Sequence, residues 1–359
     1  MSKTAFRAIV CVLVLFSLST LAFGQSSPFD KIGLLNLDQL QQRVAAATPN
    51  KYDIRTAPSD SIRSLAIRML FPLVRANTLT PLVTRTGAGA SVTENPFPGL
   101  NNDVLVDGEH ELLTQHWDAA RDRFRKVIRH CPSYYPAYQR IGITFGYQKN
   151  VDSAVVYFQK AIHQNPFDYV PYLSLAEELY SAQRYDEART AMIEALTLRP
   201  RCIFALERLH KMPELGVLEQ DSIFAPRSYA TIDEETVQIR NPPEKNLDAW
   251  KWYALAKGLQ RGEPEIQASY CGSAAMGWCE RSEYQCLHVL QLGYDASKSK
   301  TGIDPDIETL RQIEREGLLH AFMLYEIVTR MDEDQMMIAD DADRDAVRKY
   351  IGKYILPKK

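Results

Sequence analysis

Residues 101–202 consist of three 34-residue segments, which read NNDVLVDGEHELLTQHWDAARDRFRKVIRHCPSY, YPAYQRIGITFGYQKNVDSAVVYFQKAIHQNPFD and YVPYLSLAEELYSAQRYDEARTAMIEALTLRPRC. Small, large and proline positions recur at this spacing: Ala120, Ala154 and Ala188; Phe124, Phe158 and Met192; Pro132, Pro166 and Pro200. A fixed period of this length, in a sequence with helical periodicity and with a proline at the end of each segment, predicts stacked helix–turn–helix units rather than a single globular core.

The repeated segments resemble the tetratricopeptide repeat family position by position. That family has a small residue at its eighth position, where this chain has Gly108, Gly142 and Ala176. Small residues there let the two helices of one unit approach closely. The resemblance implies an αα-superhelix of three tandem units. Together with the helical segments expected on either side, a helical N-terminal extension and a helical C-terminal domain, this predicts an all-α fold.

The chain is expected to divide into four parts. These are a signal peptide at 1–24, a helical extension and flexible linker at 25–100, the repeat array with a capping helix at 101–212, and a helical C-terminal domain at 213–359. Residues 84–102 lack periodicity and are rich in Gly, Thr and Asn, which is typical of a linker.

Outside the array, apolar spacing predicts further helices. One begins near Ser59 or Asp60 and ends at Pro72, and others cover 280–292, 306–330 and 341–354. Short β-prone pieces between Arg227 and Arg240 allow a small hairpin.

The first 24 residues have the pattern of a secretory signal peptide. Lys3 and Arg7 come before an apolar run, and Ala22-Phe23-Gly24 offers the small residues of a cleavage site. The run is shorter than the roughly 20 residues that span a bilayer, although a retained anchor is the alternative. We therefore expect an exported protein, periplasmic or secreted, with no integral membrane span after cleavage.

Charge argues against nucleic acid as a partner. The chain carries 42 Lys and Arg against 45 Asp and Glu, a net charge of −3. Removing residues 1–24 takes away two basic residues and leaves a net charge of −5. Such a chain has no basic surface of the kind that binds DNA or RNA.

Cysteines suggest a crosslink rather than a metal site. Cys271, Cys279 and Cys286 lie close in sequence, which allows one disulfide among them in an oxidising compartment. A zinc site completed by His288 is the alternative, but this spacing matches no usual zinc motif. We expect no metal and no cofactor.

The sequence contains no recognised catalytic motif. The alternating acids from Asp341 to Asp345 resemble the start of a calcium loop, but Ala346 and Gly352 replace the glycine and glutamate that it requires. These acids are expected to begin the last helix instead. A non-enzymatic protein is therefore expected. The alternative is an enzyme whose unrecognised active site lies in the C-terminal helical domain, with the repeats recruiting substrate.

The resemblance implies a concave groove, lined by the first helices of the units, that binds a protein or peptide. Carried over by position, the groove residues are Leu105, Glu109, Leu112, Gln139, Arg140, Ile143, Tyr147, Leu173, Glu177 and Tyr180. The expected function is a non-catalytic scaffold or adaptor of the cell envelope or secreted space. Two alternatives remain open: the C-terminal region could fill the groove, and the array ends could mediate self-association.

Overall fold

The computed structural model describes residues 33–48, 50–58, 60–62, 64, 81–86, 89–94, 102–216, 226–272, 279–327 and 334–357. These residues group into two compact units. The array unit comprises the described residues between 81 and 198 together with 334–340. The mixed unit comprises the described residues of 33–64, 199–327 and 341–357.

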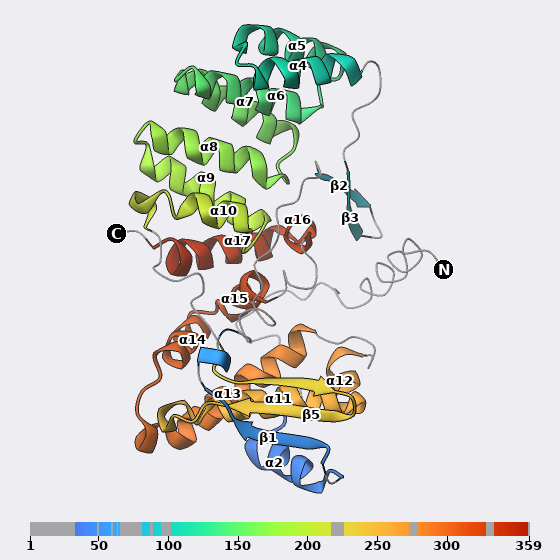
Figure 1. Cartoon of the computed structure of the whole chain (residues 1–359), viewed down its shortest axis with the longest axis vertical. Coiled ribbons are helices and arrows are strands. Elements are labelled where there is room, and N and C mark those ends of the chain that lie inside the picture. Colours follow the sequence, from blue (N-terminus) through green and yellow to red (C-terminus); the bar gives the residue numbers. More distant parts are fainter. Residues whose placement is uncertain are drawn as a thin grey trace. The chain divides into compact units, whose positions relative to one another are not determined.

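Three helix pairs make up most of the array unit (Figure 1). They are α4 (Asn102–Leu113) with α5 (Trp117–His130), α6 (Tyr135–Tyr147) with α7 (Val151–Gln164), and α8 (Tyr169–Ser181) with α9 (Tyr185–Leu198). The second helix of each of the first two pairs also packs against the first helix of the next. The predicted helix–turn–helix repeat is confirmed, and this region has the tetratricopeptide-type fold.

The same turn closes the first helix of every pair. Gln115, Lys149 and Gln183 have φ values of 64°, 57° and 60°, in the left-handed region. The amide that follows each one bonds to the carbonyl five residues earlier, as His116 N does to Glu111 O at 2.9 Å. This is the Schellman arrangement, which satisfies carbonyl groups at a helix end. The backbone conformation of this turn therefore repeats with the same 34-residue spacing as the sequence.

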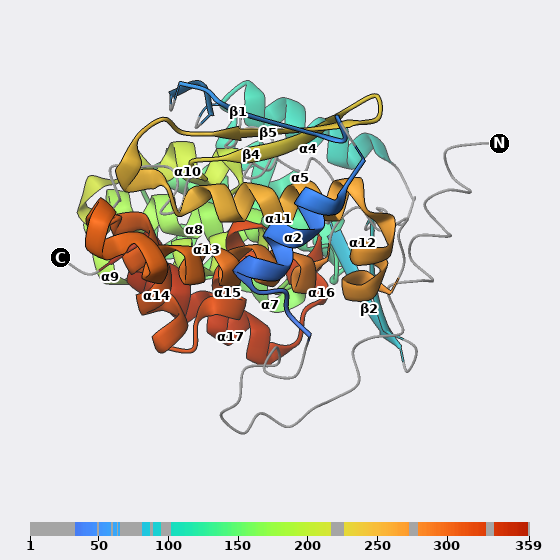
Figure 2. The same cartoon turned by 90° about the horizontal axis from the view of Figure 1, so that it is seen from below.

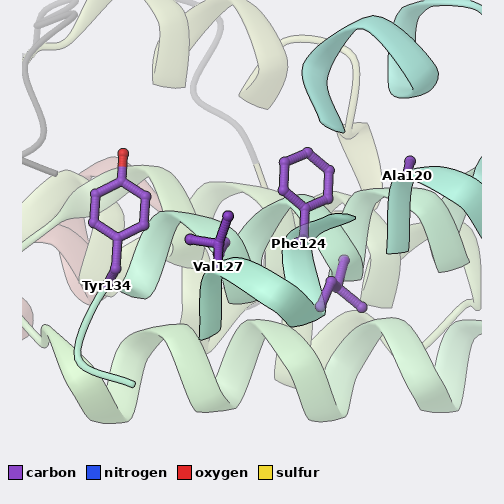
Figure 3. Packing of buried hydrophobic residues seen from close by; sticks show 6 residues of the cluster. Ala120, Phe124, Val127 and Tyr134 are labelled. Atoms are coloured by element: carbon purple, nitrogen blue, oxygen red, sulfur yellow. The ribbon is translucent and has the colours of Figure 1, made fainter. Parts of the chain in front are cut away.

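Glycines in the first two pairs allow an aromatic ring to lie against the facing helix. A Cβ atom on Gly108 would lie 2.8 Å from the Phe124 ring, and one on Gly142 would lie 2.7 Å from the Phe158 ring. Both rings are buried. The core of the first pair and the start of the next is formed by Ala120, Phe124, Val127, Tyr134, Ala137 and Ile141 (Figure 3).

A buried arginine joins the first pair to the second. Arg121 donates hydrogen bonds to Thr144 Oγ1 at 3.1 Å and to Gln148 Oε1 at 2.8 Å, and it pairs with Asp118. Its guanidinium group lies 4.4 Å from the centre of the Phe145 ring. Because these groups satisfy its donors, the charge can be buried between helices at little cost.

A β hairpin adds to the array unit. Strands β2 (Pro81–Thr86) and β3 (Gly89–Glu94) pair antiparallel. Asn165 Nδ2 donates to the carbonyl of Pro81 at 2.6 Å, and a short helix, α16 (Gln335–Ile338), contacts both β3 and α9. The stretch expected to be a linker therefore differs from the structure at 84–86 and 89–94, because contacts distant in sequence stabilise strands there.

The mixed unit contains a small sheet and most of the remaining helices. Its strands are β1 (Tyr52–Thr56), β4 (Tyr229–Asp233) and β5 (Thr236–Asn241), in the order β1–β5–β4, with β1 parallel to β5. Its helices are α2 (Leu37–Ala46), α10 (Ile203–Leu209), α11 (Trp250–Gly262), α12 (Pro264–Cys271), α13 (Glu280–Thr301), α14 (Pro305–Arg315), α15 (Leu319–Glu326) and α17 (Asp341–Tyr350). Short 3₁₀ segments cover Pro213–Leu215 and Lys245–Leu247, and a π-helical segment, Ile351–Ile355, follows α17. Helix α11 lies between the sheet and α13 (Figure 2).

One expectation for this region needs correction. The helix predicted at 306–330 is broken into α14 and α15, because Gly317 adopts a φ of 70° and Leu318 N bonds to Ile313 O at 2.9 Å. The small hairpin that the sequence allows between Arg227 and Arg240 is present as β4 and β5, and β5 also pairs with β1. The fold is otherwise helical, as expected.

Several buried polar groups in the mixed unit are paired with one another. Glu283 accepts a hydrogen bond from Tyr253 Oη at 2.7 Å and pairs with Lys257. Arg201 donates to Glu326 at 2.5 Å, and Tyr350 Oη donates to the same carboxyl group at 3.1 Å. Pairing of this kind is what allows charged groups to be retained in a core.

Some predicted segments lie outside the described residues. These are the signal peptide at 1–24 and most of the helix predicted to end at Pro72. Within the part of the chain that the structure describes, no helix has both the length and the apolar character needed to cross a membrane.

Candidate functional site

The first helices of the three pairs, α4, α6 and α8, are linked by polar contacts between their side chains. Arg140 Nε donates to Glu109 Oε1 at 2.6 Å, which joins α6 to α4. Gln139 Nε2 donates to Ser174 Oγ at 3.4 Å, which joins α6 to α8. We call the side of α4, α6 and α8 that carries these contacts the first-helix face.

Glu178 extends this face by one turn of α8. It lies four residues after Ser174, so both side chains are on the same side of the helix. Across from it, Gly146 lies seven residues after Gln139 on α6. A Cβ atom on Gly146 would be 2.6 Å from Glu178 Oε2, so the glycine leaves room for the carboxylate. Burial, and then the neighbouring Glu177, raise the pKa of Glu178.

Aromatic side chains lie where the first helices meet the second ones. The rings of Trp117 and Tyr147 stack with their centres 4.8 Å apart, and those of Tyr180 and Tyr185 are 5.3 Å apart. Tyr147 exposes 65% of its surface. Exposed aromatic side chains provide large contact areas for protein partners.

The predicted groove residues do not all lie on one open surface. Leu105 and Leu112 pack against the buried cluster around Phe124, and Leu173 is buried with 3% exposure. Arg140 lies beside Glu109, whereas Gln139, which is buried with 4% exposure, lies beside Ser174. Ile143, Glu177 and Tyr180 are partly exposed.

Glu178 and Gly146 of the face were not predicted from the sequence. Family positions did not single out Glu178 or Gly146, because the importance of each depends on the other, across two helices. The signal available in the sequence was the pair of adjacent glutamates, 177 and 178, on a first helix.

The cysteines of the mixed unit form one crosslink. Cys271 and Cys279 are joined by a disulfide with an S–S distance of 2.00 Å. Cys286 is a free, buried thiol, and burial raises its pKa to about 12. Among the described residues, no group of His, Cys, Asp and Glu side chains has the arrangement of a metal site.

A histidine of the mixed unit, His320, is held by two carboxylates. His320 Nδ1 contacts Glu280, and its Nε2 lies 3.0 Å from Asp343 Oδ1. Burial alone would lower the pKa of His320, but the hydrogen bonds to Asp343 and Glu280 outweigh it and raise the pKa to about 10. The imidazolium is therefore charged at neutral pH, and neither nitrogen is free to accept a proton from a substrate. This arrangement suits a structural role, in which ion pairs connect α13, α15 and α17, better than general-base catalysis.

Comparisons with known proteins find similarity to solved tetratricopeptide structures. The Arabidopsis OM64 TPR domain is 22% identical over 30% of this chain and 92% of that chain, with a TM-score of 0.28. The first TPR of Spaghetti (RPAP3), bound to the HSP90 peptide SRMEEVD, is 19% identical over 31% of this chain and 90% of that chain, with a TM-score of 0.29. The O-GlcNAc transferase of Thermobaculum terrenum is 18% identical over 36% of this chain and 25% of that chain, with a TM-score of 0.28.

No family model and no curated protein sequence matches the chain. The protein is therefore classified by the architecture of its two units. It has a tetratricopeptide-type array of three helix pairs and a second, largely helical unit with a small mixed sheet.

Proposed function

We propose that this protein is a non-catalytic interaction scaffold of the cell envelope or the secreted space. In this proposal, the first-helix face and the aromatic residues at its edge bind a segment of another protein. The observation that carries it is the exposure of Tyr147, which stacks on Trp117 at the end of a first helix. An aromatic side chain held in place but left open to solvent can bury much surface in a complex without first having to be ordered.

Export rests on the sequence of residues 1–24, and the disulfide between Cys271 and Cys279 supports it. Disulfides persist mainly in oxidising compartments. The alternative of an active site in the mixed unit has less support, since the His320 cluster has no nitrogen free for catalysis.

The test is affinity purification of residues 25–359 from the envelope fraction of the native cells, with partners identified by mass spectrometry. The test variant carries Tyr147→Ala and Tyr180→Ala. The control carries Val156→Ala, which removes an exposed apolar side chain from α7, a second helix. We expect a stoichiometric partner with the wild type and the control, and its loss with the test variant. Retention of the partner by the test variant would place the binding site elsewhere.

A further inference from the structure

Glu178 differs from the other charged groups identified on the first-helix face. Arg140 is neutralised by Glu109 at 2.6 Å. Glu178 is partly buried, yet within the described part of the chain its carboxylate makes no hydrogen bond or ion pair. Withdrawing a carboxylate from water without a partner is unfavourable, so the array retains a charge that its own side chains do not compensate.

The groups around the Glu178 carboxylate make the electrostatic potential there more negative. Its Oε2 atom lies over Gly146, in the last turn of α6, which ends at Tyr147. The carbonyl groups at a helix C-terminus carry partial negative charge and favour cations. The neighbouring Glu177 adds to the repulsion. The Glu178 carboxylate and the C-terminal turn of α6 therefore both make the electrostatic potential at this point of the face more negative.

We propose that the bound partner segment presents an arginine or lysine side chain to Glu178. This inference rests on the proposed function, because it assumes that the segment lies on the first-helix face. A cationic side chain would supply both the missing charge and the missing hydrogen-bond donors. Gly146 contributes by keeping space for the carboxylate, which a side chain at that position would displace.

The experiment uses random twelve-residue peptides displayed on phage and selected on residues 25–359. Selected peptides are synthesised, and their dissociation constants are measured by fluorescence anisotropy with four proteins: wild type, Glu178→Gln, Gly146→Ala, and Asp122→Asn as a control. Asp122 is an exposed carboxylate on α5, so its substitution makes the same change of charge away from the face.

We expect the selected peptides to share a basic residue and to bind Glu178→Gln about tenfold more weakly, as for the loss of a charge-assisted hydrogen bond. Gly146→Ala should weaken binding by a smaller factor, and Asp122→Asn should leave it within about twofold of the wild type. A peptide whose basic residue is replaced by Gln should bind wild type and Glu178→Gln equally well.

The outcomes separate this inference from the proposed function. Peptides that lose affinity with Tyr147→Ala and Tyr180→Ala, but not with Glu178→Gln, would overturn the inference and leave the proposed function in place. Peptides that respond to neither set of substitutions, or a selection that enriches no peptide, would overturn both.

Discussion

At the scale of single residues, two charged groups have opposite relations to their surroundings. Glu178 has a carboxylate without a counter-charge among the described residues, whereas His320 has two carboxylates bound to one ring. The pKa of each group is raised, but for different reasons. Their effects on stability should therefore differ in sign.

Glu178→Gln should stabilise the protein at neutral pH. Removing a partly buried, uncompensated charge is expected to raise the free energy of unfolding by roughly 0.5–1 kcal/mol. The pKa of Glu178 is raised in the folded state, so the wild type gains stability as pH falls through that raised value. The gap between variant and wild type should shrink on acidification. Urea unfolding at pH 7 and pH 5 checks this, and a less stable variant at pH 7 would show that Glu178 has a partner in the free protein.

His320→Gln should destabilise the mixed unit at neutral pH and have little effect at high pH. The folded-state pKa of about 10 lies above the ordinary value of 6.5, so the contribution is complete below about 6.5 and is lost as pH rises through 10. Its size should be on the order of 2 kcal/mol, because water partly screens groups that are more than a quarter exposed. Chemical denaturation of both proteins from pH 6 to pH 10.5 measures the difference. If the difference in the free energy of unfolding does not change with pH, the ion pairs of His320 do not stabilise the protein as proposed.

At the scale of elements, the repeated glycine–phenylalanine contact explains why the helix pairs can be read from the sequence. Gly142 faces Phe158, and the equivalent positions of the third pair hold Ala176 and Met192. A flexible methionine accommodates a Cβ atom where a phenyl ring does not. Substitutions at the glycine position and at the phenylalanine position of a pair should therefore be energetically coupled.

Gly142→Ala alone should lower the free energy of unfolding of the array by about 1–3 kcal/mol through overpacking against the Phe158 ring. Adding Phe158→Met, which recreates the third pair's combination, should recover part of that loss. Thermal unfolding of the four proteins of this double-mutant cycle gives the coupling. Simple additivity of the two substitutions would contradict the proposed packing.

Elements stabilised by distant contacts could not be predicted in the same way. The β2–β3 hairpin lies in a segment rich in Thr, Gly and Asn, and the carbonyl of Pro81 accepts a hydrogen bond from Asn165 of the array. Strand β1 pairs with β5, with Tyr52 opposite Val237, so the whole array lies between the two strands in the sequence. Glu178 was missed for the same reason, since its significance depends on Gly146 of another helix. Local periodicity carries no information on such pairs.

At the scale of the whole molecule, the state of the cysteines depends on two things. Disulfide formation depends on the redox conditions of the compartment, and the reactivity of the free thiols depends on their burial in the fold. Cys131 is partly exposed, Cys202 and Cys286 are buried, and Cys271 and Cys279 are crosslinked. Residues 25–359 contain only these cysteines. Their reactivity should therefore distinguish the folded from the unfolded protein and the oxidised from the reduced protein.

Thiol titration of residues 25–359, isolated from an oxidising compartment, should find Cys131 alone reacting rapidly in the folded protein. Unfolding without reductant should expose the three free thiols, Cys131, Cys202 and Cys286. Reduction should then add the two thiols of the Cys271–Cys279 disulfide. Five reactive thiols in the unfolded, unreduced protein would show that the disulfide does not form in that compartment.

If the first-helix face binds another protein, site-specific photocrosslinking in the native cells should capture that protein. A photoreactive phenylalanine analogue at position 147 replaces the exposed Tyr147, and the same analogue at exposed Val156 on α7 is the control. We predict a discrete adduct to a second protein from position 147 and none from position 156. Adducts only within the chain itself, or equal adducts from both positions, would contradict it.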